Sequence, residues 1–327
     1  MSEKNVPTNN FHTPVDNDPA RSFRNIWINL LLYPTHSLPT ALAPVLVGVG
    51  LAIHHGVFAL LPVLAGFFAS WVIHVAGVFT DNHELLRKHP GLQEHPELDS
   101  AIKDGTLRLP TLRAAIGVCL VLALATAPYL YRVGGAPVLW FGAIGIVASF
   151  SYNGGPWAYV RRGLADPIFF LMFGIVGVLG TYYIQAAAVL GAPEPWTLLK
   201  LLPLSVYLVG LPAGAIVTAV MLIDDVRDHD FDQKKGWRTG AVRFGVSFNR
   251  AEITALVAFA YVMPFALWIG LGFKVWILLT LVSAPFAWST VQNVRTAPSR
   301  TELIPMTPRM ALLALMHSAL LAIGIAL

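Results

Sequence analysis

Five aspartates crowd into nine residues at 224–232, directly after a long apolar run. If the helix continues past that run, Asp224, Asp228 and Asp232 follow one another at i, i+4 and i+8, and their carboxylates form one ridge. Stacked like charges repel each other, so a shared cation would stabilise them. Hard oxygen ligands favour Mg²⁺, which commonly binds through one or two carboxylates and leaves room for the phosphates of a substrate.

Basic side chains surround this acidic run. They are Arg227, Lys234, Lys235 and Arg238. Positive charge beside a metal site is what a bound diphosphate requires. We therefore expect these four residues to bind the diphosphate, although a solvated, charged loop at a helix end would have a similar composition.

A second acidic cluster, Thr80-Asp81-Asn82-His83-Glu84, follows the second apolar run. Asp81 and Glu84 are three residues apart and would share a helical face, and Asp99 and Asp104 lie farther along. Alone, the cluster is also compatible with an ordinary loop beside a membrane. Together with the first cluster, it predicts a two-site metal clamp on a diphosphate. The predicted Mg²⁺ ligands are Asp81, Glu84, Asp224, Asp228 and Asp232.

Aromatic hydroxyls occur at two further places. Tyr152 precedes Asn153-Gly154-Gly155-Pro156 at the end of an apolar run, and Tyr182 lies inside the apolar run 165–190. Polar groups within such a run point inward to a bundle or cavity. Turn formation at 153–156 and helix packing at 180–181 explain the same residues without a ligand.

The elements that position these residues are membrane-spanning helices. Hydrophobic residues make up 56% of the chain and charged residues 12%, and a helix of roughly 17 to 25 residues crosses a bilayer. Such runs lie near residues 26–53, 57–79, 112–131, 136–152, 165–190, 198–223, 253–272, 274–291 and 308–327. We therefore predict an all-α integral membrane bundle of about nine transmembrane helices.

The charges also predict how the bundle is oriented. With a cytoplasmic N-terminus, all but three of the 22 Lys and Arg residues lie on the cytoplasmic side, the exceptions being Arg132, Lys200 and Lys274. This asymmetry follows the positive-inside rule and puts both acidic clusters in the cytoplasm. Residues 1–25 are predicted to be a polar cytoplasmic segment without a cleavable signal, and residues 26–327 one transmembrane domain. The one cysteine, Cys119, excludes a disulfide framework.

These motifs resemble those of the UbiA superfamily of membrane prenyltransferases, above all its 1,4-dihydroxy-2-naphthoate prenyltransferase branch. The second motif of that branch, Asn-Asn-x-Arg-Asp-x-x-x-Asp-x-x-x-Gly-Lys-x-Thr-x-Ala-Val-Arg-x-Gly, is similar to residues 224–245. Positions in register are Arg227, Asp228, Asp232, Gly236, Thr239, Ala241, Val242, Arg243 and Gly245. The segments Tyr152 to Pro156 and Gly180 to Gln185 also resemble signatures of the branch.

The sequence departs from that pattern at four places. Asp224 and Asp225 replace the paired Asn, and Trp237 replaces the Lys. Glu84 stands where the first motif, Asn-Asp-x-x-Asp, has its second aspartate. Tyr33 replaces a basic residue before the proline of the first helix.

The resemblance implies Mg²⁺-dependent transfer of a prenyl group from a prenyl diphosphate to an aromatic acceptor similar to 1,4-dihydroxy-2-naphthoate, within a bundle open to lipid. Asp81, Asp228 and Asp232 would be catalytic through the metal, and the rings of Tyr152 and Tyr182 would stabilise the allylic cation. Three alternatives remain: a hydroxybenzoate-like acceptor, a terpene cyclase of the same superfamily that needs no acceptor, and a transporter or small-molecule binding protein.

Overall fold

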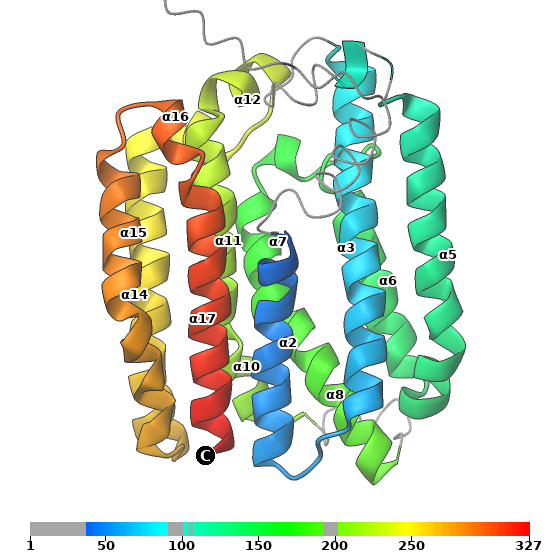
Figure 1. The fold of residues 1–327 in the computed structure, drawn as a ribbon, viewed down its shortest axis with the longest axis vertical. Coiled ribbons are helices and arrows are strands. Elements are labelled where there is room, and N and C mark those ends of the chain that lie inside the picture. Colours follow the sequence, from blue (N-terminus) through cyan, green and yellow to red (C-terminus); the bar gives the residue numbers. More distant parts are fainter. Residues whose placement is uncertain (1–36, 91–100, 104, 106, 192–201) are drawn as a thin grey trace, which may run out of the picture.

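The computed structural model describes residues 37–90, 101–103, 105, 107–191 and 202–327, and within them it is a bundle of helices without strands (Figure 1). The predicted N-terminal segment 1–25 and the residues Tyr33, Asp99 and Asp104 lie outside the described part. The all-α membrane fold expected from the apolar runs is confirmed.

Eight helical segments are long and apolar enough to cross a membrane. They are α2 (Ser37–His54), α3 (Leu60–Lys88), α5 (Leu109–Gly134), α7 (Ala165–Leu171) continued through the π-helical η2 (Met172–Val176) into α8 (Gly177–Leu190), α10 (Leu204–Val209) continued into α11 (Leu211–Arg227), α14 (Val246–Leu271), the 3₁₀-helical η4 (Val275–Ser283) continued into α15 (Ala284–Thr296), and α16 (Arg300–Leu303) with α17 (Met306–Ala326). A ninth apolar helix, α6 (Ala136–Phe150), is shorter. The remaining short helices are η1 (Val160–Arg162), α12 (His229–Lys235) and α13 (Gly240–Phe244).

Helix α11 is the central helix of the bundle. Of its most apolar window 83% is buried, against 17% for α5 at the periphery. Small residues allow this burial: a Cβ at Gly214 would lie 2.6 Å from the Cα of Gly174 in η2, so the two backbones touch. The beginning of α11 therefore packs directly against the backbone of η2.

The outward surface of the bundle is apolar. Large hydrophobic side chains such as Leu61, Val121, Trp140 and Ile269 are more than 60% exposed. Exposed apolar side chains on every peripheral helix suit a lipid environment. The protein is thus an integral membrane protein that crosses the bilayer several times.

Both acidic clusters lie in or beside helices instead of in loops. Helix α3 continues to Lys88, so Asp81 and Glu84 occupy its last two turns, and α11 continues to Arg227. These helix ends and α12 lie at the same end of the bundle, at the top of Figure 1, which we call the acidic end. The two clusters therefore meet on helix ends, and the alternative of ordinary charged loops does not describe them.

The expected unbroken ridge of aspartates is also interrupted. Asp228, with φ −105° and ψ 15°, separates α11 from α12. Backbone hydrogen bonds still join Asp228 N to Asp224 O (2.8 Å) and Asp232 N to Asp228 O (2.9 Å). The chain bends at Asp228 while the three aspartates remain one turn apart.

Helix α6 is the least buried of these apolar helices. Of its residues only Pro137 is buried. A Cβ placed on Gly142 or Gly145 would have no other atom within 4 Å. Bare backbone therefore faces open space at these two positions.

Candidate active site

A cavity of about 690 Å³ runs from the acidic end into the membrane-spanning part of the bundle. Along α3 its lining extends from Val63 to Leu85, which at 1.5 Å per residue is about 30 Å of helix. Most of the wall is apolar, including the bare backbone of Gly142 and Gly145 on α6. Charged residues line it only at the acidic end.

The acidic end of the cavity gathers most of the residues predicted from the sequence. Five carboxylates and two guanidinium groups line it within the described residues, namely Asp81, Asp224, Asp225, Asp228, Asp232, Arg227 and Arg300. Tyr152 lines the same cavity. The excess of negative charge makes this end a site for cations.

Arg227 and Arg300 hold the central aspartates. The buried Arg227 guanidinium donates from Nη2 to Asp228 Oδ2 (2.5 Å), and its Nη1 lies 2.5 Å from Asp224 Oδ1. Arg300 Nε donates to Asp228 Oδ1 (3.0 Å). Thr307 on α17 donates its hydroxyl to Asp224 Oδ1 (2.6 Å). Charge-assisted bonds of this kind fix the carboxylates in a partly dry site.

Asp232 is paired on the other side of the bend. Lys235 Nζ lies 3.0 Å from Asp232 Oδ1 and 3.7 Å from the centroid of the Trp237 ring. The Trp237 ring packs edge-on against Tyr152, with centroids 6.0 Å apart. Trp237, which replaces a Lys of the family pattern, thus fills the wall and holds Lys235 by a cation–π contact.

Asp81 is connected to the segment after α6. Asn153 Nδ2 donates to Asp81 Oδ1 (2.9 Å), and Arg161 Nη2 donates to the backbone oxygen of Asn153 (2.8 Å). The turn at 153–156 thus positions a catalytic candidate, beyond reversing the chain. Asn153 and Arg161 were not predicted, because no spacing rule links them to Asp81.

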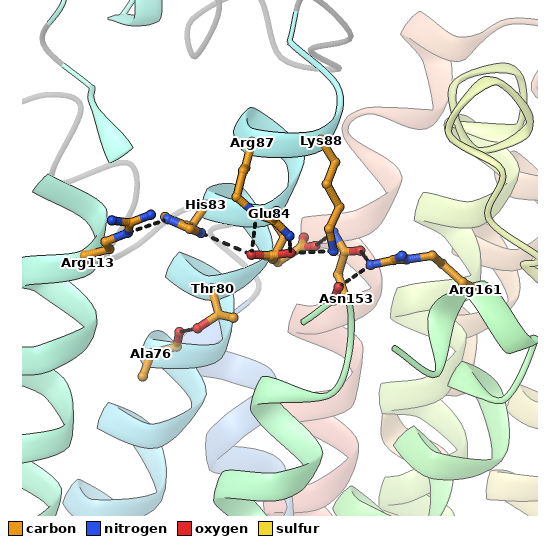
Figure 2. A network of polar contacts seen from close by, with 10 residues as sticks. Ala76, Thr80, His83, Glu84, Arg87, Lys88, Arg113, Asn153 and Arg161 are labelled. Atoms are coloured by element: carbon orange, nitrogen blue, oxygen red, sulfur yellow. Dashed lines mark hydrogen bonds and ion pairs between the residues drawn. The ribbon is translucent and has the colours of Figure 1, made fainter. Parts of the chain in front are cut away.

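Glu84 pairs with basic residues near the end of α3, and Figure 2 shows these contacts beside those of Asn153 and Arg161. Its carboxylate accepts from Arg87 Nη2 (2.7 Å), pairs with Lys88 and lies 3.3 Å from His83 Nδ1. Arg113 on α5 donates to the other ring nitrogen of His83 (3.0 Å). Glu84 does not line the cavity, so in this arrangement it neutralises basic residues of its own helix.

Two predicted diphosphate ligands also lie outside the cavity. Lys234 is exposed and lies over the Phe231 ring at 5.8 Å, and the Arg238 side chain is exposed. Lys235 is close to the cavity through Asp232. Among the predicted basic residues, only Arg227 contributes directly to the lining.

Tyr152 lies between the two acidic clusters. Burial raises the pKa of its hydroxyl well above the usual value, and the charges of Asp81, Asp225 and Asp232 raise it further. The phenol therefore stays neutral. Tyr182 is elsewhere: its hydroxyl is 2.8 Å from His55 Nδ1, and it does not line the cavity. The expectation that its ring faces the reacting carbon is not supported.

Asp225 and Arg300 are the main functional candidates that the sequence did not assign. Asp225 is 4% exposed, and its Oδ2 has no hydrogen-bond partner among the described residues. Arg300 reaches Asp228 across 72 positions of sequence. The acidic motif gave a signal for Asp225, whereas nothing in the sequence connects Arg300 to that motif.

The described residues contain no group of three His, Cys, Asp or Glu side chains close enough to hold one metal ion. Arg227 and Arg300 pair with Asp228, and Lys235 pairs with Asp232. A metal that binds here must displace some of these pairs. The freed basic groups would then lie beside any anion that accompanies the metal.

Comparison with known proteins places this arrangement in a family. The model of the UbiA prenyltransferase family matches residues 41–306. The chain is 30% identical over 277 residues to the 1,4-dihydroxy-2-naphthoate octaprenyltransferase of Mycobacterium tuberculosis, covering 83% of this chain and 87% of that protein. It is 24% identical over 310 residues to the Escherichia coli enzyme of the same name, covering 91% and 94%.

Solved structures share the fold. A UbiA homolog from Aeropyrum pernix K1, in its apo form, matches with a TM-score of 0.57 and 17% identity, covering 83% of this chain and 94% of that one. A UbiA homolog from Archaeoglobus fulgidus, bound to GPP and Mg²⁺, matches with a TM-score of 0.50 and 17% identity, covering 90% and 99%.

Proposed function

The chain belongs to the UbiA prenyltransferase family, and from this premise we infer that it transfers a prenyl group from a prenyl diphosphate to an aromatic acceptor in quinone biosynthesis. It is an enzyme, a prenyltransferase. The observation that carries the reaction is the cavity itself, which joins one strongly acidic end to a long apolar interior. A diphosphate with its metal suits the first part, and a prenyl chain suits the second.

The acceptor is 1,4-dihydroxy-2-naphthoate and the donor octaprenyl diphosphate. The support is the name shared by the relatives from Mycobacterium tuberculosis and Escherichia coli, which match this chain over most of its length.

Mg²⁺ is the metal that the acidic end would hold. The unpartnered, buried Oδ2 of Asp225 supports this assignment, because a buried carboxylate oxygen without a partner is costly unless a cation reaches it. The UbiA homolog of Archaeoglobus fulgidus was solved with GPP and Mg²⁺. The ligands would be Asp81, Asp224, Asp225, Asp228 and Asp232. When bound, the metal supplies positive charge that stabilises the departing diphosphate.

Residues of the chain supply the rest of the chemistry. As the bond between the allylic carbon and the diphosphate oxygen breaks, its electron pair leaves with the diphosphate, and Arg227 and Arg300 are placed to bind that charge. A ring carbon of the acceptor then forms a bond to the allylic carbon. Loss of the group that this ring carbon carried, a proton taken up by the departing diphosphate or a carboxylate released as carbon dioxide, restores the aromatic ring. The apolar wall excludes water that would otherwise quench the cation, and the neutral Tyr152 ring lies beside the acidic end to stabilise it.

The acidic end faces the cytoplasm. The support is the excess of Lys and Arg in the segments on that side. In a Cys119→Ala background, a cysteine at Gln233 should react with an impermeant reagent only from the cytoplasmic face, and one at Glu194 only from the opposite face. Labelling of both from one face would refute this orientation.

The reaction is tested with the purified full-length protein in lipid nanodiscs. We expect octaprenyl diphosphate and 1,4-dihydroxy-2-naphthoate to give a prenylated aromatic product and free diphosphate, and EDTA to abolish both. A cyclic hydrocarbon formed without acceptor would indicate a terpene cyclase. Absence of metal-dependent diphosphate release would contradict an enzymatic function.

A further inference from the structure

His74 is a titratable side chain in the cavity that the reaction described above does not use. It lies on α3 seven residues before Asp81, and both line the cavity. Seven residues are nearly two helical turns, so His74 is on the same face as Asp81 and about 10 Å deeper. It is the only His, Asp, Glu, Lys or Arg of the described lining that lies below the acidic end.

The contacts of His74 leave one of its ring nitrogens unpaired among the described residues. Nε2 is 2.7 Å from Ser37 Oγ, at the first residue of α2. The ring stands edge-on to Phe173, with centroids 6.1 Å apart. Among the described residues Nδ1 has no hydrogen-bond partner. His74 is partly exposed and lines the cavity, so a ligand in the cavity can reach this ring.

The neighbouring hydroxyls of the cavity, unlike Nδ1 of His74, already have hydrogen-bond partners. Those of Ser70 and Thr181 donate to backbone oxygens of their own helices, at 2.9 Å and 2.8 Å. Such bonds satisfy a hydroxyl without any ligand. A prenyl tail offers no hydrogen-bonding group. A cavity that held only the tail would therefore leave Nδ1 of His74 unpaired against hydrocarbon, which is unfavourable.

We propose that His74 and Ser37 form the polar side of the acceptor pocket and bind a hydroxyl or carboxyl group of the aromatic acceptor, while Phe173 packs against its ring. The proposal rests on the proposed function. The reacting ring carbon must meet the allylic carbon next to the diphosphate, so the acceptor has to lie between the acidic end and the apolar interior. His74 and Ser37 occupy that level of the cavity, and the acceptor is the substrate that brings polar groups there.

The test is steady-state kinetics of the full-length protein in nanodiscs, with each substrate varied at saturation of the other. We expect His74→Ala to raise the KM for 1,4-dihydroxy-2-naphthoate at least tenfold and to leave the KM for octaprenyl diphosphate within twofold. Ser37→Ala should raise the acceptor KM less. His74→Gln, which keeps a hydrogen-bonding group at the site, should recover part of the loss.

His55 provides a matched control. It forms the same kind of pair, 2.8 Å from the Tyr182 hydroxyl, but does not line the cavity. His55→Ala should change neither KM. A structural role of His74 would lower the melting temperature and the amount of active enzyme without separating the two KM values.

The outcomes are distinguishable. If wild-type protein prenylates the acceptor and neither His74→Ala nor His74→Gln changes the acceptor KM, the acceptor pocket is elsewhere and the inference is wrong. The same holds if the donor KM rises as much as the acceptor KM. If wild-type protein transfers to no aromatic acceptor, the proposed function itself has failed, and this inference with it.

Discussion

The acidic ends of α3 and α11 differ in how many of their carboxylates reach the cavity. On α11 and α12, four aspartates line it. On α3, Asp81 lines it, whereas Glu84, three residues later, pairs with Arg87 and Lys88. Both clusters have helical spacing, so spacing alone does not decide which carboxylates are available to a metal.

Two local features account for the difference. The bend at Asp228 interrupts the helix, and arginines from other positions, Arg227 and Arg300, hold the carboxylate in the cavity. Helix α3 has no such bend, and basic residues at i+3 and i+4 bind Glu84 along its own surface. Asp224 and Asp232 also have a basic partner at i+3, yet both line the cavity. A basic residue at i+3 therefore does not by itself keep a carboxylate away from a ligand.

The strongest test of this contrast removes one charge from the second cluster. Asp228→Asn keeps the shape of the side chain but weakens its bonds to Arg227 and Arg300 and removes a metal ligand. We expect kcat/KM to fall about 10³-fold, which corresponds to about 4 kcal/mol. The control is Asp230→Asn, because Asp230 is exposed and pairs only with His229 among the described residues. An Asp228→Asn enzyme within tenfold of wild type at saturating Mg²⁺ would contradict the assignment.

A second test compares the two acids of the first cluster. Asp81→Asn should lower the rate about 100-fold and raise the Mg²⁺ concentration for half-maximal rate. Glu84→Gln should leave the Mg²⁺ curve unchanged and lower the melting temperature, because its ion pairs with Arg87 and Lys88 are lost. A Mg²⁺ titration of both variants shows which of the two carboxylates binds the metal. A shifted curve for Glu84→Gln would show that Glu84 leaves its basic partners and binds metal.

A third test compares two arginines near the second cluster. Arg300→Ala should raise the KM for the prenyl diphosphate about tenfold, since one charge-assisted hydrogen bond to the diphosphate is lost. Arg238→Ala should change it by less than about threefold, because that side chain is exposed outside the cavity. Equal effects of the two substitutions would mean that the diphosphate lies nearer to the surface than the cavity indicates.

The smallest effect is expected at Tyr152, between the two clusters. Its pKa is raised by burial and by nearby carboxylates, so with rising pH the phenol keeps its proton beyond the usual value of about 10. The rate of the Tyr152→Phe variant should therefore stay within about threefold of the wild-type rate from about pH 6 to 9. The rate of the Tyr152→Leu variant, which lacks the ring, should fall further. An alkaline loss of rate present in wild type and absent in Tyr152→Phe would show that the hydroxyl does ionise.

The sequence predicted the elements better than the contacts between them. Long apolar runs have one physical explanation in lipid, so the helical bundle and the meeting of the two clusters followed from them. The pairing of Glu84 with Arg87 and Lys88 was predictable in principle from their i+3 and i+4 spacing. Its position outside the cavity was not, because Asp224 and Asp232 also pair at i+3 and line the cavity. The bond between Arg300 and Asp228 was not, because helix packing brings together residues that are 72 positions apart. Likewise, a helical wheel does not show that Asp225 is buried without a partner.

The low burial of α6 has a consequence for how this protein can change during evolution or by design. Gly142 and Gly145 face open space, and a side chain added there meets no neighbour within 4 Å of its Cβ. Substitutions at these positions therefore cost little in packing, while each added methyl group takes volume from the cavity. Substitutions on this one helix can thus set the cavity volume available to the prenyl chain. They leave the acidic residues that carry out the reaction unchanged.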